Sequence, residues 1–198
     1  MKKTNNKGFS LVELIIVIAI MAILVGAIAP ALIRYIDKSR KSNDVTSAKT
    51  IKTAVETALG NEDIYSYLTN ITTGDFSTVT IEPGKATATT GSTSEAVTIS
   101  NCSATGIEVS VADVDKLAKK EIGTNIGEKT PKLKYKKANT EADVCKCTVT
   151  PKKFYALISK KGTVYVLIGD GAPSNLPTDL SNYTDAYSIC PETCGAYQ

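Results

Sequence analysis

A run of twenty residues without a formal charge, residues 14–33, limits what this chain can fold into more than any other feature. As an α-helix rising 1.5 Å per residue, the run would be roughly 30 Å long, which is the thickness of a bilayer's hydrocarbon core. Three lysines precede the run and four basic residues follow it within eight positions, so the flanking charge does not set its orientation. The run therefore predicts a segment that spans a membrane at some stage.

A secretory signal peptide is the simplest alternative for such a segment. Its apolar core has about 7 to 15 residues and is followed by a small-x-small cleavage site. Here the apolar core is longer, contains Pro30 and continues directly into the polar residues 37–40. No cysteine follows closely, as a lipoprotein anchor would require. We therefore expect a segment that the mature protein retains.

An acidic residue, Glu13, stands at the N-terminal boundary of the apolar run. A carboxylate at an apolar boundary costs about 2 to 3 kcal/mol, or more as it lies deeper in a membrane, so it needs a cation. Residues 7–14 read KGFSLVEL, follow a short basic leader and open the long apolar helix. This pattern resembles the class III leader of type IV pilins and their relatives, over about the first 35 residues.

In the pilin family, a prepilin peptidase cuts after the leader's glycine and methylates the new N-terminus. The resemblance implies cleavage between Gly8 and Phe9 on the cytoplasmic side, with N-methylation of Phe9. It also implies that Glu13 neutralises the new amine of Phe9, in its own or in a neighbouring subunit, during fibre assembly. The two groups are about one helical turn apart, roughly 6 Å along the axis, and such a pair sets register more than it adds stability. The alternative is a solvated Glu13 at a helix start.

Two residues that weaken helices, Gly26 and Pro30, stand inside the apolar run. Proline removes one backbone hydrogen bond and both residues lower helix stability, which predicts a local break. In the pilin family, a helix in this zone can straighten, melt or stretch when the subunit leaves the membrane. Membrane helices also tolerate both residues without such a role, and the two interpretations stay open.

Beyond residue 37, apolar residues recur every three or four positions, which is typical of a helix with one buried face. These residues are Val45, Ala48, Ile51, Val55, Ala58 and Leu59. Gly60 is a natural C-terminal stop. We expect one helix over residues 9–59, whose first part, 9–36, contacts lipid or other subunits and whose second part packs under a head. Residues 1–8 form the leader and residues 60–198 the head.

Within the head, period-two alternation predicts half-buried antiparallel strands at residues 79–81, 97–99 and 107–111. A short helix is expected next, ended by Gly123. Its apolar face comprises Val114, Leu117, Ala118 and Ile122.

The strongest strand signal is a hairpin of residues 154–158 and 164–168, expected to pack on the helix stripe. The chain after Gly169 is expected to be loop. The expected fold class is α+β: a long N-terminal helix packed on an antiparallel β-sheet head, as in the pilin fold.

Five cysteines leave at least one thiol unpaired in a monomer. Cys145 and Cys147 are two apart on a predicted strand, residues 144–150, so they project from one face and are badly placed to bond each other. Cys190 and Cys194 lie near the C-terminus, where many pilins close a loop with a disulfide. We expect a tie between this tail pair and the Cys145/Cys147 strand, with Cys102 free. Other pairings, or five free thiols in an anaerobic cell, stay open.

Several function classes lose their support from composition. The chain has no histidine, so imidazole zinc sites, Ser-His-Asp triads and Cys-His dyads cannot form. Neither a phosphate-binding loop nor a nucleophile elbow is present. Four thiolates could hold zinc, but C-x-C with C-x-x-x-C departs from the usual spacing. Without the leader's three lysines, 20 basic and 20 acidic residues balance, which removes support for a nucleic-acid partner. We expect no enzyme, metal or cofactor.

The resemblance implies a structural subunit of a type IV pilus. The precursor would lie in the cytoplasmic membrane, lose its leader after Gly8 and polymerise into an extracellular helical fibre for adhesion or motility. The prepilin peptidase, the assembly platform and the motor would be separate chains. A pseudopilin of a type II secretion or DNA-uptake system is an alternative, and a membrane-anchored extracellular binding module is another. Major or minor status, adhesion target, fibre symmetry and glycosylation stay open.

Overall fold

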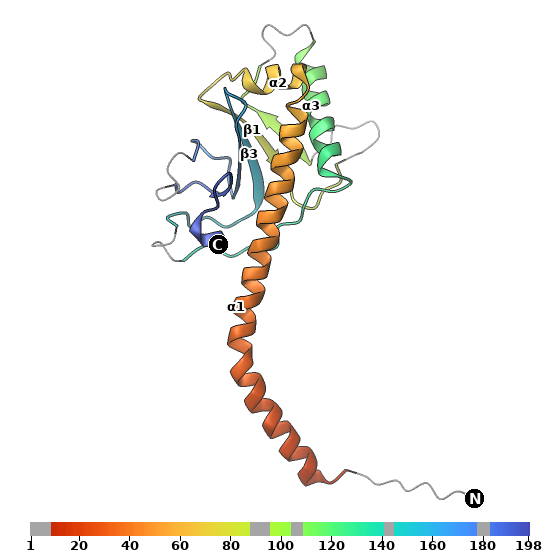
Figure 1. Cartoon of the computed structure of the whole chain (residues 1–198), viewed down its shortest axis with the longest axis vertical. Coiled ribbons are helices and arrows are strands. Elements are labelled where there is room, and N and C mark those ends of the chain that lie inside the picture. Colours follow the sequence, from red (N-terminus) through yellow and green to blue (C-terminus); the bar gives the residue numbers. More distant parts are fainter. Residues whose placement is uncertain (1–8, 88–95, 104–108, 141–144, 178–182) are drawn as a thin grey trace, which may run out of the picture. The chain divides into compact units, whose positions relative to one another are not determined.

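The computed structural model describes residues 9–87, 96–103, 109–140, 145–177 and 183–198. The helices are α1 (Leu11–Ala58), α2 (Glu62–Thr69), α3 (Val111–Ile126) and the short 3₁₀ turn η1 (Gly195–Tyr197) (Figure 1). The strands are β1 (Phe76–Ile81), β2 (Val97–Ser100), β3 (Lys153–Ser159), β4 (Val164–Gly169) and β5 (Tyr187–Cys190). The chain divides into two compact units, Met1–Ser39 and Arg40–Gln198, with the boundary inside α1.

The sheet of the head is antiparallel, with the strand order β2-β1-β3-β4-β5. The predicted hairpin is confirmed as β3 and β4, which are in register from Lys153↔Gly169 to Ile158↔Val164. Gly162 closes its turn at φ +77°, where a Cβ atom would lie 2.8 Å from the Tyr65 ring. The predicted strands 79–81 and 97–99 are confirmed as parts of β1 and β2. The expected α+β class is therefore confirmed.

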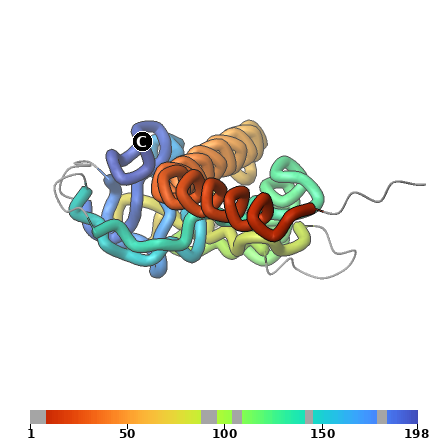
Figure 2. Tube along the Cα trace, turned by 90° about the horizontal axis from the view of Figure 1, so that it is seen from below, coloured from red at the N-terminus to blue at the C-terminus, as the bar shows by residue number. Residues whose placement is uncertain are grey.

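The main core lies on one face of the sheet. The second half of α1 buries Ala48, Ile51, Val55 and Ala58 against it, as the helical stripe predicts. The buried sheet residues on this face include Val79, Ile81, Phe154, Ala156, Ile158, Val166 and Ile168. Figure 2 shows α3, in green, beside the second half of α1, in light orange, and an Asn125 amide donates to the Ala54 carbonyl between them. A smaller cluster that includes Tyr155, Leu157 and Leu167 covers the opposite face.

The expected end of α3 at Gly123 is wrong. Gly123 lies inside the helix, where a Cβ atom would approach the Thr87 carbonyl oxygen to 3.2 Å, so its role is close packing. The helix ends instead before Gly127, whose φ of +112° favours glycine. The predicted strand 107–111 is wrong at its described end, because Ser110 caps α3 and Val111 begins it. Residues 107 and 108 lie outside the described residues.

Two further expectations about strands need correction. The described part of the predicted strand 144–150, residues 145–150, is irregular, although both of its cysteines are buried. The chain after Gly169 is not all loop, because β5 pairs with β4 and η1 follows it. All four residues of β5 are buried, so the strand lacks the polar alternation by which an edge strand is usually recognised. The helix α2, capped by the Asn61 side chain, was not expected either.

Candidate functional site

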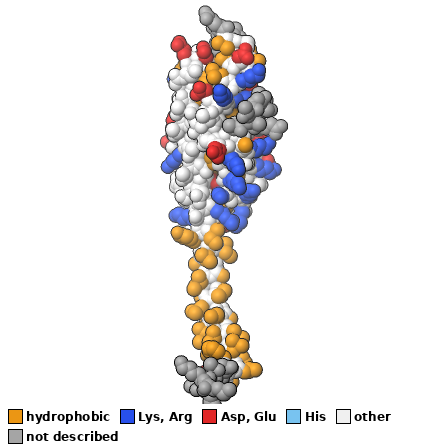
Figure 3. All heavy atoms as spheres, turned by 90° about the vertical axis from the view of Figure 1, so that its right-hand side faces the viewer, with side chains coloured by type: hydrophobic (Ala, Val, Ile, Leu, Met, Phe, Trp, Pro, Cys, Tyr) orange, Lys and Arg blue, Asp and Glu red, His pale blue; other side chains and the backbone are white. Residues whose placement is uncertain are grey.

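The first half of α1 is an apolar helix without cover. Large side chains such as Ile23 and Val25 are 74% and 65% exposed. Among the described residues, α1 is the helix that is long and apolar enough to cross a membrane. Figure 3 shows hydrophobic side chains over the visible face of this segment. Since exposed apolar surface of this extent is costly in water, the segment requires lipid or other protein around it.

The side chain of Glu13 reaches back to the start of α1. The backbone N–H of Ser10, the residue before the helix, donates to Glu13 Oε2 at 2.9 Å. The Ser10 carbonyl accepts the first helical bond, from Leu14 N–H at 3.2 Å. A carboxylate in the first turn also meets the partial positive charge of the helix N-terminus. The spacing Ser10-x-x-Glu13 is a recognised capping signature, so this contact was readable from the sequence and was missed.

The predicted processing site lies next to this cap. Phe9 precedes the helix and is 93% exposed, and Gly8 lies outside the described residues. The carboxylate of Glu13 therefore points at the backbone nitrogen of the residue directly after Phe9. The structure thus places Glu13 and residue 9 together at one end of α1.

The expected break at Gly26 and Pro30 is absent, because α1 is continuous from Leu11 to Ala58. Pro30 has no N–H to donate to the carbonyl of Gly26, the residue four positions before it, so the proline costs the helix one bond. A Cβ atom at Gly26 would meet nothing within 4 Å. One missing bond does not interrupt a helix of 48 residues. A break in an assembled fibre stays a proposal.

A second carboxylate of α1, Asp44, is fully buried. Its Oδ1 accepts the N–H of Lys134 at 2.7 Å and its Oδ2 accepts the N–H of Tyr135 at 2.8 Å. Burial raises the pKa of Asp44 above its ordinary value, against the opposing effect of these two bonds and of the Lys134 charge. Asp44 lies four residues before Ala48 on the buried stripe, and this position is the signal that could have identified it.

The structure has all five cysteines as thiols: Cys102 is half-buried, and Cys145, Cys147, Cys190 and Cys194 are buried. Of the expected tail-to-strand pairs, Cys145 and Cys194 influence each other, because the Cys145 thiol adds to the effect of burial in raising the pKa of Cys194. Burial raises the pKa of Cys194 to about 12 and that of Cys147 to about 11. Burial also raises the pKa of Cys190, against the opposing effect of the Lys52 and Lys49 charges of α1. A disulfide from the tail to Cys145 stays a prediction. In the described part of the chain, no group of three or more His, Cys, Asp or Glu residues could hold a metal ion.

Comparison with known proteins identifies a family model and several relatives. Residues 3–29 match the family model of the prokaryotic N-terminal methylation motif. The chain is 37% identical over 66 residues to the type IV major pilin protein PilA of Myxococcus xanthus, covering 33% of this chain and 30% of that protein. It is 34% identical over 97 residues to the type IV major fimbrial protein FimA of Dichelobacter nodosus, covering 46% of this chain and 62% of that protein.

A further relative is the prepilin peptidase-dependent protein A of Clostridium perfringens, 37% identical over 70 residues, or 35% of this chain and 50% of that protein. The chain thus spans between 30% and 62% of the lengths of these three relatives. No solved structure matches it significantly.

Proposed function

We propose that this chain, a type IV pilin-like subunit, is made as a membrane-embedded precursor, cut after Gly8 and polymerised through α1 into an extracellular fibre. One observation carries the proposal: an exposed apolar helix that begins with a carboxylate beside the cleavage position. Lipid covers this helix before assembly, and the helices of neighbouring subunits cover it afterwards. Apolar burial then drives both states.

Cleavage supplies a cation for Glu13. The cut places a positively charged α-amine on Phe9, one residue before the N–H that Glu13 already accepts. Methylation keeps that charge, since a secondary amine is still basic. In a fibre core of low dielectric, Glu13 of one subunit neutralises the amine of its own or of a neighbouring subunit. An unpaired charge there is strongly disfavoured, so the pair selects one register of packing.

The remaining steps fall to other chains in this proposal. A prepilin peptidase cuts and methylates, while an assembly platform and a motor extract the subunit from the cytoplasmic membrane. The fibre on the cell surface serves adhesion or motility, and the head forms its outer surface. We expect no catalytic activity from this chain.

Mass spectrometry of the mature N-terminus is the direct test. We expect a chain that begins at N-methylated Phe9. An intact Met1, or a cut after residue 30, would contradict the proposal. Shearing the cells and imaging the supernatant then separates long filaments, expected of a pilin, from a short pseudopilus of a secretion or DNA-uptake system.

A further inference from the structure

The head carries a short segment whose lysines are exposed. Along residues 132–136, Lys132, Lys134 and Lys136 are exposed, whereas Leu133 is buried and Tyr135 is half-buried. The apolar side chains of the segment are thus turned to the core and the three ammonium groups to the surface. We call residues 132–136 the lysine strip.

The lysine strip is fastened to α1 at the start of the head unit. Asp44 accepts the N–H groups of Lys134 and Tyr135. The ring of Tyr135 lies under the Lys41 ammonium, 4.9 Å from it, and packs edge-on against Tyr197 at 5.9 Å. These contacts hold the segment in place, so its outward face is a fixed feature of the head.

Beside the lysine strip is a groove of about 630 Å³, which we call the lysine groove. Its basic walls are Lys132, Lys136 and Lys152, and Leu133 and Pro151 are among its other lining residues. Gly84, at φ +73°, also lines it, and the stem of Lys132 lies 3.2 Å from where a Cβ atom of Gly84 would be. Glycine is therefore needed here both for the backbone conformation and for the position of Lys132.

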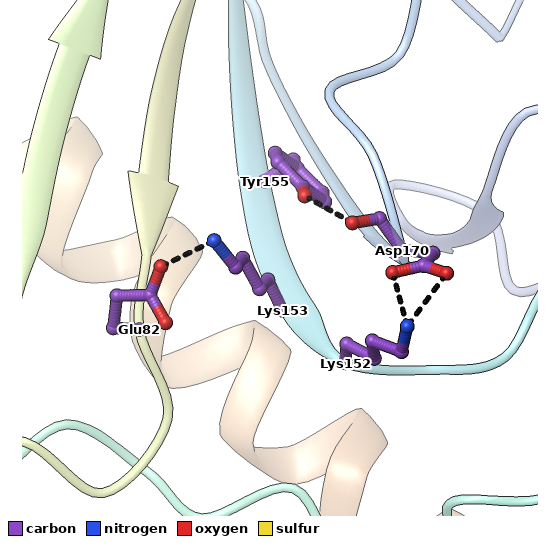
Figure 4. Close-up of polar contacts among 5 residues, drawn as sticks. All are labelled: Glu82, Lys152, Lys153, Tyr155 and Asp170. Carbon is purple, nitrogen blue, oxygen red and sulfur yellow. Dashed lines mark hydrogen bonds and ion pairs between the residues drawn. The ribbon is translucent and has the colours of Figure 1, made fainter.

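Of the three lysines that line the groove, Lys152 has an ion pair, as has the neighbouring Lys153. Figure 4 shows Lys152 paired with Asp170 at 2.8 Å and Lys153 paired with Glu82 at 2.5 Å. Within the described part of the chain, no carboxylate forms an ion pair with Lys132 or Lys136. Two cations without a carboxylate partner among the described residues favour an anionic ligand.

The wider charge distribution points the same way. Residues 129–153 contain eight lysines and two acidic residues, an excess of six positive charges. The zero balance of the chain without its leader conceals this local excess. Figure 3 shows the Lys and Arg side chains gathered over one part of the head.

Chain connectivity brings this basic surface near a membrane. Eight residues join Ile33, the last residue of the uncharged run, to Lys41, which contacts the strip. Whatever the orientation of the head, that tether reaches at most about 27 Å, and about 12 Å as a helix. Phosphate headgroups are thus presented to the groove at high effective concentration.

We propose that the lysine strip and the lysine groove bind the phosphate headgroups of anionic phospholipids while the precursor is in the membrane. This inference rests on the membrane stage of the proposed function. A nucleic acid fits less well, because binding of single strands relies on exposed aromatic rings, and the Tyr135 ring is already occupied by Lys41 and Tyr197. Each lysine near an anionic surface contributes roughly fivefold in affinity.

The test uses the full chain in lipid nanodiscs, which leave both membrane faces open to reagents. One set contains phosphatidylcholine alone and the other contains one third phosphatidylglycerol. An amine-reactive reagent labels the lysines, and peptide mass spectrometry gives the rate at each. In the anionic discs, we expect Lys132, Lys136 and Lys152 to react about fivefold more slowly. At 1 M salt, where screening is nearly complete, the difference disappears.

Matched variants separate this surface from the other lysines of the head. In K132Q/K136Q, the slower labelling of Lys152 in anionic discs should be lost. The control K116Q/K120Q changes two exposed lysines of α3 and should leave it intact. Lys161, exposed in the turn between β3 and β4, should react equally in both discs.

Three results would overturn the inference. If the chain inserts and its lysines react equally in both discs, the surface does not bind anionic lipid, and the proposed function is unaffected. If soluble polyphosphate or single-stranded DNA slows the labelling of these lysines equally well in neutral discs, the ligand of the surface is a soluble polyanion. If the chain inserts into neither disc, the membrane stage of the proposed function is wrong, and this inference is wrong as well.

Discussion

Two carboxylates on α1, Glu13 and Asp44, have different structural roles. Glu13 is exposed and accepts a backbone N–H within its own first turn. Asp44 is fully buried and accepts two N–H groups from a segment about ninety residues away in the chain. The first closes a helix locally, and the second ties the helix to the head. Each role predicts a different defect on substitution.

Replacing Glu13 tests charge pairing against capping. Glu13→Val removes both functions, so processing at Gly8 should continue while filaments are lost, because a buried unpaired amine costs about 3 to 5 kcal/mol per subunit. Glu13→Gln keeps a side-chain acceptor for the Ser10 N–H but not the charge, and it should also fail to form filaments. Filament yield after shearing gives the measurement. Normal piliation in Glu13→Gln would assign Glu13 to capping alone.

Replacing Asp44 tests the tie between α1 and the head. Asp44→Ala leaves the N–H groups of Lys134 and Tyr135 without their acceptor, at about 1 to 3 kcal/mol each, so the free energy of unfolding should fall by about 2 to 6 kcal/mol. Urea denaturation of the detergent-solubilised chain measures the change. Glu56→Ala, which breaks an exposed pair with Lys52, should cost less than about 0.5 kcal/mol. Equal effects of the two variants would contradict the role given to Asp44.

Among the elements, the β3–β4 hairpin is the one that local sequence determines most completely. Its strands alternate in side-chain direction, and Gly162 meets both the positive φ of the turn and the contact with the Tyr65 ring. Gly162→Ala should lower the free energy of unfolding by about 1 to 2 kcal/mol, because alanine is strained at this φ. Gly171→Ala is the matched control, since no atom lies within 4 Å of its Cβ position. Thermal melts of both variants measure the effect.

Elements and sites differ in how far the sequence predicts them. The hairpin, the α1 stripe and the leader motif are patterns of neighbouring residues, so they were predictable. Strand β5 is buried throughout, and Gly123 is packed against Thr87. Tertiary contacts therefore determine both features, and the local sequence pattern predicted them wrongly. The lysine groove needed residues from three distant segments, and only the alternation along residues 132–136 hinted at it. Nothing local placed Asp44 against that segment.

At the scale of the whole molecule, one helix serves two environments. Most residues of α1 before the unit boundary at Ser39 are exposed and apolar, whereas the buried residues of α1 all lie between Asp44 and Ala58. The main core cluster, with the residues packed against it, begins at Val45 and ends at Tyr197, so none of it depends on the apolar segment.

Residues 35–198 produced alone should therefore be folded and soluble without detergent. Circular dichroism and a dispersed amide NMR spectrum would show that the shortened chain is folded. Gel filtration would show that it is monomeric. The full chain, as the control, should require detergent or lipid because its first half is uncovered. Aggregation of the shortened chain would contradict the division into two units.

The contact between Ser10 and Glu13 has a consequence for the fibre proposed above. It engages only one oxygen of the carboxylate, Oε2. A carboxylate accepts hydrogen bonds on both oxygens, so the acid can hold its own helix start and meet an amine at the same time. The side chain is thus oriented before a partner arrives, and joining costs less side-chain freedom than it would for an unattached acid.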